Sequence, residues 1–579
     1  MSRPPARALL DALARRGALD LLGRMGILPL VTVLWRLGRR PQTWREERDV
    51  LRDYRKFRAT HGPTLGPGAI LADPRRKVLV VSLTDWALQI KGEAMLAKAL
   101  QLRGLTPVIA IDPLAVRARR YFRVFGFRDF VSLERFDTRA HESEVRAEAA
   151  AWIAGSRSFR DLRELQYRDV HVGRHVLGTI CRMLRQGTPD LADPRVRAML
   201  ERLLPAAMRT VRRTERLVAA ERPEMALFLE RGYTPYGEVY DVLLNAGVNV
   251  VQWVGSHVNE SLVFRRCTQE NRHDHPFSLA DETWDEVRRH PWTEMEDAIL
   301  RREFGDRYRD GAWFNRQRLQ DGKRVKAADE IRRQLGLDPG KKTAVVFSHL
   351  LWDATFFFGT DVFDNYEQWL VETVRAACRN PRLNLVVKLH PANVWKIRRE
   401  DPNAEFVEER VLREQIGPLP PHVKLVRPET DINTYSFFQL MDYCLTVRGT
   451  IGMEAPCYGI PVVTAGTGRY SGRGFTLDSR DREEYLARLA RLETVPSLAP
   501  AEIELAKKHA HALFKLRPLE FTSFRLRYPD VETPSHPLDH NVDVLVRSFA
   551  ELAAAPDLKA FADWAIHSKR PDFMNGLGE

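Results

Sequence analysis

The segment from Leu445 to Thr464 constrains the fold of this chain more than any other part of its sequence. It reads as a short apolar strand, a turn built from Gly449, Thr450 and Gly452, the start of a helix, and a second apolar strand. A helix that begins after a glycine turn presents free backbone N–H groups and the positive end of its dipole, where a phosphate can bind. Glu454, in the first helical turns, could then bind a ribose diol. The same pattern is equally typical of an ordinary βαβ turn, in which Glu454 only complements the helix dipole.

Apolar runs of strand length alternate with helical patterns twice along the chain. In the first half, strands are predicted at residues 77–82, 107–111, 225–229 and 248–254, with a helix at 92–103. In the second half, strands are predicted at 343–347, 383–389 and 423–426 and within 445–464, with a helix at 366–380. Strands that alternate with helices form parallel sheets covered by helices. The predicted fold class is therefore α/β, with two Rossmann-like domains facing a cleft and an N-terminal helical segment.

A chain of 579 residues is too long for one hydrophobic core, so two large domains are expected. The predicted division is a helical segment and linker at 1–68, a first Rossmann-like domain with a helical insertion at 69–300, a helical connection at 301–338, a second Rossmann-like domain at 339–541, and a helix at 542–579 that returns to the first domain. Within the first segment, residues 62–68 are rich in glycine and proline and are predicted to be the linker itself.

The charge balance favours anionic partners. Lys and Arg number 90 against 77 Asp and Glu, which gives a net charge of +13. Nucleic acid is not expected, because zinc-finger spacing and RNA-binding aromatic motifs are absent from the sequence. Leucines and arginines interleave before residue 58, a pattern typical of a helix lying on anionic membrane or of a helical pair packed on the main body. The apolar run at 26–35 is too short to span a bilayer.

The five cysteines are far apart and form no C-x-x-C pair, which indicates a reducing compartment and argues against a cysteine metal site.

Polar residues follow three strands of the first predicted sheet. Asp85 follows the strand at 77–82, Glu230 the strand at 225–229, and His257 the strand at 248–254. The carboxyl ends of parallel strands meet at one edge of a sheet, so these side chains could share a cleft, and one could act as a general base. Glu230 ranks first because a glycine, expected to be flexible, follows it closely. Asp85 could instead only cap the next helix.

Lys388 and His390 close the strand predicted at 383–389. Two groups that can carry positive charge at a sheet edge suit a monophosphate or diphosphate leaving group, whose developing charge needs preorganised donors. A lone histidine more often caps the following turn, but the same domain also supplies Glu454 and a glycine-rich loop at 465–474.

These motifs together resemble a known family. Lys-Leu-His-Pro at 388–391, Arg-Gly-Thr-Ile-Gly-Met-Glu-Ala at 448–455, Gly-Ile-Pro-Val-Val-Thr at 459–464 and Gly-Arg-Tyr-Ser-Gly-Arg-Gly-Phe-Thr at 468–476 are similar to motifs of the capsule polysaccharide biosynthesis family, which includes bacterial 3-deoxy-octulosonate transferases of GT-B fold. The resemblance is strongest over 343–476 and weaker over 223–284, which contains Glu-Arg-Gly-Tyr-Thr-Pro-Tyr-Gly. The His-Pro pair and the Gly-x-x-Gly-x-Glu-Ala turn are also similar to motifs of glycerophosphotransferases that build teichoic acids.

The resemblance implies a two-domain transferase whose second domain binds a nucleotide-sugar and whose first domain binds the acceptor and supplies the base. By this resemblance, Lys388 and His390 would contact the donor phosphate or sugar, and Glu454 the ribose. The donor would also approach the backbone at Gly449, Thr450 and Gly452. Arg448 stands where other members carry a small residue, and would either add a phosphate contact or indicate a different donor. The base must come from Glu230, Asp85 or His257, in that order.

A transferase without metal or cofactor is predicted. Asp361 and Asp364 are close in sequence, but their aromatic neighbours suggest the entry to a helix and not a metal site. A GT-B enzyme can instead stabilise the leaving phosphate with helix dipoles and basic side chains.

The favoured function is transfer of a sugar from a nucleotide-sugar donor to a capsular or other cell-surface polysaccharide or glycolipid. The expected location is the cytoplasm, at the inner face of the membrane. One alternative on the same scaffold is a CDP-polyol phosphotransferase or a UDP-sugar epimerase. Another is a non-catalytic protein that binds acidic polysaccharide and helps its export.

Overall fold

The computed structural model describes residues 42–66, 72–258, 260–309, 312–313, 317–318, 320, 322–398, 401–528 and 536–576. Helix α4, Gln42–Leu65, packs on α6, Val116–Val124, and contributes Val50 and Phe57 to a hydrophobic core. The linker predicted from residue 62 therefore starts inside this helix, because Leu65 is still buried there. The rest of the predicted membrane-surface segment, residues 1–41, lies outside the described residues. None of the described helices is long and apolar enough to cross a membrane.

The first sheet has seven strands in the order β15-β6-β5-β4-β1-β2-β3. Its strands are β1 (Lys77–Ser82), β2 (Thr106–Ile111), β3 (Phe130–Val131), β4 (Met225–Phe228), β5 (Asn249–Gly255), β6 (Ser261–Cys267) and β15 (Leu519–Glu520). Strands β1 to β5 are parallel, and β6 and β15 are antiparallel additions at one edge. Strand β1 is apolar along nearly its whole length, because it lies inside the sheet and helices cover both of its faces.

Helices on both faces complete the first domain. They are α5 (Ala87–Gln101), α6, the 3-10 turn η1 (Leu133–Phe136), α7 (Arg139–Gly155), α8 (Phe159–Arg163), α9 (Val172–Leu184), α10 (Pro194–Glu221) and α11 (Tyr236–Asn245). Helix α5 shares one core with α4 and α6, and α10 and α11 pack on the opposite face. Helices α7 to α10 form the predicted insertion. Their apolar side chains belong to the same hydrophobic cluster as Trp369 and Leu385 of the second domain, so the insertion joins the two domains.

The second sheet has six strands, all parallel, in the order β11-β10-β9-β12-β13-β14. They are β9 (Thr343–Phe347), β10 (Asn384–Lys388), β11 (Val423–Val426), β12 (Tyr443–Thr446), β13 (Val462–Thr464) and β14 (Leu477–Asp478). Successive strands run outward from β9 in one direction and then, from β12, in the other. The switch point therefore lies between β9 and β12, where open α/β sheets bind ligands.

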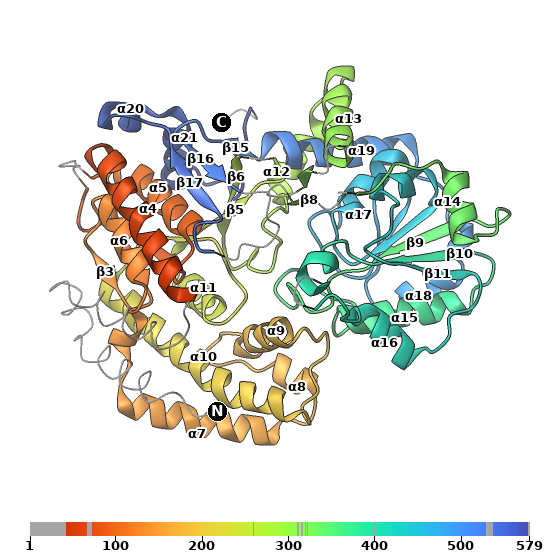
Figure 1. The fold of residues 1–579 in the computed structure, drawn as a ribbon, viewed down its shortest axis with the longest axis horizontal. Coiled ribbons are helices and arrows are strands. Elements are labelled where there is room, and N and C mark those ends of the chain that lie inside the picture. Colours follow the sequence, from red (N-terminus) through yellow and green to blue (C-terminus); the bar gives the residue numbers. More distant parts are fainter. Residues whose placement is uncertain are drawn as a thin grey trace.

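The second domain carries its helices on both faces of this sheet (Figure 1). They are α15 (Tyr366–Cys378), the π-helical turn η3 (Val394–Arg398), α16 (Val407–Gln415), η4 (Thr434–Gln439), α17 (Ile451–Glu454), η5 (Ala455–Tyr458), α18 (Arg482–Ala490), η6 (Leu492–Thr494), α19 (Pro500–His511) and η7 (Ala512–Leu516). The connection between the domains contains α12 (Asp281–Arg289), α13 (Glu294–Arg309), the short hairpin β7 (Ala312–Trp313) and β8 (Gln317–Arg318), and α14 (Ala328–Leu335).

The chain returns to the first domain earlier than residue 542, the position predicted from the sequence. Strand β15 already pairs with β6, and β16 (Phe524–Arg527) pairs with β17 (Asn541–Val544). Residues 542–544, predicted to be helical, therefore belong to a strand, which pairs with β16 and exposes only Asp543. Helices α20 (Phe549–Ala554) and α21 (Pro556–His567) follow, and α21 packs on α5, so the two ends of the described chain lie side by side (Figure 1).

Two Rossmann-like domains are thus present, and a cleft of about 830 Å³ lies between them. The predicted α/β class and its GT-B type arrangement are confirmed.

Candidate functional site

A cavity of about 130 Å³ opens at the switch point of the second sheet, and we call it the switch-point cavity. Loops that follow β9, β10 and β12 form most of its wall, and two residues come from the connection between the domains. The lining residues are Tyr308, Gln320, Phe347, Ser348, His349, Lys388, Leu389, His390, Pro391, Thr434, Thr446, Gly449, Thr450, Ile451 and Glu454. Five of the seven residues predicted to bind the donor, namely Lys388, His390, Gly449, Thr450 and Glu454, therefore converge on one cavity.

Lys388 supplies the cavity with a cationic group. The side chain is buried at the end of β10, and its Nζ lies 5.9 Å from the ring centres of Phe347 and Phe437. Within the described part of the chain it has no carboxylate partner in an ion pair. Burial, with a smaller effect from Lys323, lowers the pKa of Lys388 to about 7. An anion bound beside the ammonium group would relieve this cost.

His390 presents a hydrogen-bond donor next to Lys388. The Nδ1 of its ring accepts a hydrogen bond of 3.1 Å from the backbone N–H of Ala392. The backbone N–H of His390 donates a hydrogen bond of 3.0 Å to Ser348 Oγ. Burial, with Lys396 and Lys388 nearby, lowers the pKa of His390 to about 3, so the ring is neutral. A neutral imidazole that accepts at Nδ1 carries its proton on Nε2, which is then the donor available to a ligand.

His349 also lines the switch-point cavity, and in the sequence only its position after a strand marks it as a candidate. Its ring stacks on Tyr366 at 4.5 Å, and its Nε2 accepts hydrogen bonds from the backbone N–H groups of Val447 and Arg448 at 3.3 and 3.4 Å. Burial lowers its pKa well below the ordinary value. His349 thus ties the end of β9 to the glycine turn after β12.

Glu454 forms the acidic wall of the cavity. It is almost fully buried, and its carboxylate accepts a hydrogen bond from the hydroxyl of Tyr308. Burial raises the pKa of Glu454. Tyr308 belongs to α13, in the connection between the domains, so a helix that carries no motif completes the site. A buried carboxylate opposite a buried ammonium group can bind the hydroxyl groups of a ligand whose phosphate lies near Lys388.

The predicted glycine turn is present, but Gly449 and Gly452 occupy it for different structural reasons. The N–H of Gly449 donates to Thr446 Oγ1 at 3.2 Å, and α17 is a single turn that continues as the 3-10 turn η5. Gly452 was predicted to allow a ligand to approach the backbone. A Cβ atom there would instead lie 2.0 Å from the hydroxyl of Tyr470, so Gly452 is required by packing within the protein.

Arg448 does not reach the switch-point cavity. Its guanidinium group forms an ion pair with Asp361 and lies 5.7 Å from the ring of Tyr366. Asp361 was predicted to mark a helix entry, and the structure also makes it the counter-ion of Arg448, five residues before α15 begins. Together they fasten the loop before α15 to the loop after β12.

Glu230 lies at the corresponding edge of the first sheet, after β4. It is half-buried, and its Oε1 accepts a hydrogen bond of 3.0 Å from the N–H of Arg231. Burial raises the pKa of Glu230 to about 7, and Arg182 opposes that change. Asp353, which follows β9 in the second domain, also acts on this carboxyl. Glu230 therefore faces the second domain.

The other two candidate bases occupy different surroundings. Asp85 lies in the loop after β1, next to β4 in the sheet, so it shares the switch point of the first domain with Glu230. His257 is buried, with its ring stacked on Phe277 at 4.4 Å and against Phe514 at 5.3 Å. Burial, with Arg307 and Arg469 nearby, lowers its pKa well below the ordinary value.

The glycine near Glu230 is not flexible in this structure. Gly232 has a φ angle of +125°, and a Cβ atom on it would lie 2.4 Å from the ring of Phe357 in the second domain. A Cβ atom on Gly237 would lie 2.2 Å from the ring of His175. Gly232 is therefore required where the first domain packs on the second, and Gly237 where α11 packs on α9 within the first domain, so both glycines are explained without any ligand.

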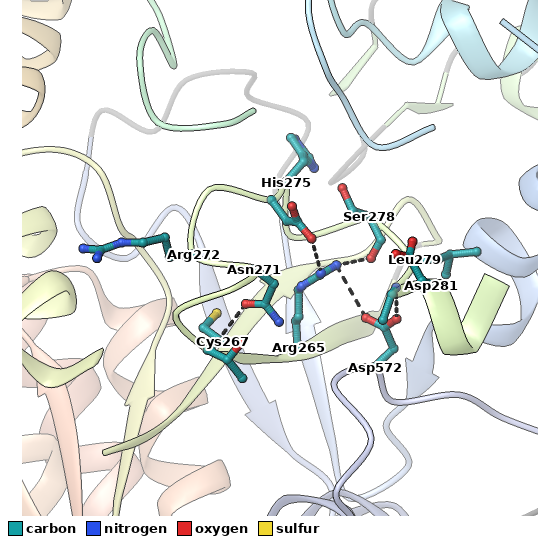
Figure 2. Close-up of polar contacts among 12 residues, drawn as sticks. Arg265, Cys267, Asn271, Arg272, His275, Ser278, Leu279, Asp281 and Asp572 are labelled. Carbon is teal, nitrogen blue, oxygen red and sulfur yellow. Dashed lines mark hydrogen bonds and ion pairs between the residues drawn. The ribbon is translucent and has the colours of Figure 1, made fainter. Parts of the chain in front are cut away.

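The larger cavity, which we call the interdomain cleft, lies between the loop after β6 and the glycine-rich loop of the second domain. Figure 2 shows how the first of these loops is held. Buried Arg265 forms ion pairs with Asp274 at 2.6 Å and with Asp572 at 3.6 Å. Across the cleft, Arg469 contacts the Nε2 of His275 at 3.1 Å. Arg265 thus joins the loop after β6 to the C-terminal segment around Asp572, and together they form the wall of the cleft that faces the second domain.

A family model described as capsule polysaccharide biosynthesis protein matches residues 206–507, just over half of the chain. The chain belongs to the capsule polysaccharide biosynthesis family. The resemblance drawn from the sequence motifs is thereby confirmed. The part matched to this family runs from α10 to α19, so it includes Glu230, His257 and the whole second sheet, but not Asp85.

Solved structures match this chain only at low sequence identity and low TM-score. Staphylococcus aureus MnaA with UDP is 14% identical, covers 76% of this chain and 92% of its own, and has a TM-score of 0.23. The KpsC β-Kdo 2,7 transferase of Thermosulfurimonas dismutans is 18% identical over 54% of this chain and 82% of its own, with a TM-score of 0.30. The spinosyn rhamnosyltransferase SpnG is 13% identical, covers 75% of this chain and 95% of its own, and has a TM-score of 0.23. No curated protein sequence matches this chain.

Proposed function

We propose that this member of the family is a glycosyltransferase that moves a sugar from a nucleotide-sugar to a capsular or other cell-surface polysaccharide or glycolipid. The observation that carries the proposal is the ammonium group of Lys388, which is buried in the switch-point cavity without a carboxylate partner among the described residues. An isolated buried cation is costly, and an anionic ligand offsets that cost. A nucleotide phosphate is the anion that such a crevice most often binds.

In the proposed reaction, the bond between the anomeric carbon and the donor phosphate breaks, and negative charge grows on the phosphate oxygen. Lys388 and the Nε2–H of His390 would stabilise that charge from positions fixed before the reaction. Glu454, held by Tyr308, would bind the ribose hydroxyl groups. The leaving group would therefore be held at both of its ends.

The acceptor hydroxyl would be activated from the first domain. Glu230 would take its proton as the hydroxyl oxygen forms the new bond to the anomeric carbon. A carboxyl with a pKa of about 7 is suited to this role, because the best general base titrates near the working pH. Asp85 and His257 remain the alternative bases, and Glu230 is preferred because it faces the second domain.

The proposed enzyme uses no metal and no cofactor, since Lys388 and the ring N–H of His390 would supply the positive potential at the phosphate. Turnover is therefore expected to persist in an excess of a chelator such as EDTA. We place the reaction in the cytoplasm, at the inner face of the membrane. Residues 1–41, with their interleaved leucines and arginines, would rest on anionic lipid, whereas the rest of the predicted segment packs on the first domain as α4.

A thermal-shift screen against CMP, CDP, UDP, GDP, dTDP and their sugar conjugates tests the proposal. A ligand that binds only the folded protein raises its melting temperature. At least one nucleotide should stabilise the wild type, and Lys388→Met should abolish that shift. The matching nucleotide-sugar should then release free nucleotide when an acceptor glycan is added. Absence of any shift, or binding without turnover of any conjugate, would favour the non-catalytic reading instead.

A further inference from the structure

Asp353 lies at the point where the two domains meet and contacts both of them. It follows β9 and is four residues beyond His349, and its side chain is largely buried. Its carboxylate accepts a hydrogen bond of 2.8 Å from the hydroxyl of Tyr233 in the first domain. The same hydroxyl accepts a hydrogen bond of 2.9 Å from the N–H of Ala354. Tyr233 is thus fixed on both sides by the loop that carries Asp353.

Two cations complete the surroundings of this carboxylate. Lys396, in the π-helical turn after His390, forms an ion pair with Asp353 through Oδ2. Arg182, in α9, lies over the ring of Tyr233 at 4.6 Å, and its Nε is 3.9 Å from Asp353 Oδ1. These cations lower the pKa of Asp353 and keep it ionised against the effect of burial. One carboxylate therefore contacts two groups of the first domain, Tyr233 and Arg182, and one of the second, Lys396.

This cluster lies between the two halves of the site. Asp353 and Arg182 both act electrostatically on Glu230, in opposite directions. Asp353 and Lys396 both act on His390, again in opposite directions. The other groups that face Glu230 are Arg231 in its own loop and Tyr236 at the start of α11. Asp353 is thus the residue that influences the electrostatics of both Glu230 and His390.

We propose that Asp353 is a positioning residue that couples the acceptor side of the site to the donor side. It holds Tyr233 and Arg182 of the first domain against Lys396 of the second, and thereby sets the charge around both Glu230 and His390. The catalytic meaning of this coupling rests on the proposed function, in which Glu230 is the base and His390 contacts the donor phosphate.

The coupling predicts opposite effects of two substitutions. In Asp353→Asn, the negative charge near Glu230 is removed and Arg182 and Lys396 lose their counter-ion, so both changes favour the ionised form of Glu230. In Lys396→Met, Asp353 keeps its charge without the lysine that neutralises it, which disfavours ionisation of Glu230. The pKa of Glu230 should therefore fall in the first variant and rise in the second, each by roughly one pH unit.

Asp364 offers a matched control. It lies in the same loop region and also joins the domains, through an ion pair of 2.6 Å with Arg160 of the helical insertion. Its side chain is 29% exposed against 19% for Asp353, and it is not among the groups that shift the pKa of Glu230 or His390. Asp364→Asn removes an interdomain contact of the same kind and should leave the titration of Glu230 unchanged.

The titration can be followed without turnover, by ¹³C NMR of the full chain labelled at glutamate carboxyl carbons. The signal of Glu230 is the one missing from Glu230→Gln. We expect a wild-type midpoint near 7, a lower one in Asp353→Asn and a higher one in Lys396→Met. The acidic limb of the pH profile of kcat should move in the same directions. A midpoint that is equal in all variants would overturn the coupling.

The two proposals fail in different ways. If nucleotide-sugars are not turned over but the Glu230 signal still shifts in opposite directions, the proposed function fails and the coupling stands. If turnover occurs and both variants lose activity equally with unchanged midpoints, the function stands and Asp353 is only a structural contact. A variant that unfolds is recognised by its melting curve. If Asp353→Asn unfolds, Asp353→Glu takes its place, and because this variant keeps the negative charge, its Glu230 midpoint should equal that of wild type.

Discussion

The two domains share one strand order, but the side chains at their switch points have opposite chemistry. In the first sheet the switch point lies between β1 and β4, and Glu230 and Asp85 follow these two strands. Glu93 of α5 is fully buried nearby, and burial raises its pKa to about 8. In the second sheet the switch point lies between β9 and β12. Lys388 is the last residue of the neighbouring strand β10, and His390 follows that strand. The first edge thus carries carboxyl groups, whereas the second carries Lys388 and His390 beside the single carboxyl group of Glu454.

This difference teaches how one architecture can divide the work of a transfer reaction. Burial disfavours the charged form of any group, so it acts in opposite directions on acids and bases. It raises the pKa of Glu230 to about 7 and lowers that of Lys388 to about 7. Both groups can therefore change protonation near neutral pH, one to accept a proton from an acceptor and the other to hold an anion. The strand order fixes where the groups lie, and their charge decides which substrate each edge serves.

Glu230→Gln should have the largest effect. Loss of a general base typically lowers kcat about 10²- to 10⁴-fold. Because the base must be ionised, wild-type kcat/KM should rise with pH through about 7, and the variant should lose that limb. A raised carboxyl pKa also makes the folded state less stable as pH rises from the unfolded pKa to about 7, so the variant should be more stable than wild type at pH 8. Stopped assays across pH and thermal melts measure both effects.

Glu224→Gln is the control for this experiment. Glu224 precedes β4, at the opposite end of the strand from Glu230, and it is paired with Arg76 at the surface. Its replacement should leave kcat and the pH profile unchanged. If Glu230→Gln behaves in the same way, then the acidic edge does not supply the base and the comparison between the edges loses its catalytic meaning.

Lys388→Met should have the next largest effect. Removing one preorganised positive charge beside the leaving phosphate should lower kcat about 10²- to 10³-fold. Nucleotide affinity of the wild type should fall as pH rises above 7, because the empty site must take up a proton to bind the anion. The variant should lose this pH dependence and should be more stable without ligand, by about 1–3 kcal/mol, since an unpaired buried cation is gone. Isothermal titration calorimetry at several pH values measures the first effect.

Lys342→Met serves as the control here, since Lys342 lies just before β9, at the far end of the sheet, and bonds to the hydroxyl of Tyr443 at 2.9 Å. Nucleotide affinity and its pH dependence should match wild type. Equal loss in both lysine variants would show that the effect is one of general charge and not of the switch-point cavity.

Much of this comparison could be predicted from the sequence, because strands and strand ends are local features. The apolar runs located the sheets, and the residues at their ends or just beyond them included Lys388, His390 and Glu230. The contribution of Tyr308 could not be predicted, since it comes from a helix with no motif and depends on how the connection crosses the second domain. The partner of Arg448 was missed for the same reason, because Asp361 reaches it through tertiary packing.

The motif glycines show the other limit of the sequence. A glycine before a helix predicts a turn, but the sequence does not say which atom occupies the space of the missing Cβ. At Gly452 that atom belongs to Tyr470, and at Gly232 it belongs to Phe357 of the other domain. Both positions are fixed by packing that only the folded chain reveals.

Glu454→Gln should have a moderate effect confined to donor binding. The carboxylate would bind hydroxyl groups in both the ground state and the transition state, so KM for the donor should rise about tenfold with kcat little changed. Tyr308→Phe removes the hydroxyl that holds Glu454 and should raise KM by a smaller factor. Initial-rate kinetics at varied donor concentration separate the two constants. A fall in kcat with unchanged KM would instead place Glu454 at the reacting atoms.

His257→Asn should have the smallest effect on catalysis, and it tests which residue of the acidic side is the base. His257 follows β5 in the same sheet as Glu230, but its ring is enclosed by Phe277 and Phe514 and is neutral. Losing these ring contacts should lower the free energy of unfolding by about 1–2 kcal/mol, while kcat stays within about threefold of wild type. Chemical denaturation and initial rates measure the two quantities. If kcat instead fell a hundredfold in a folded variant, the base would be this imidazole and not the carboxylate of Glu230. The contrast between an acidic and a basic switch point would then describe binding but not proton transfer.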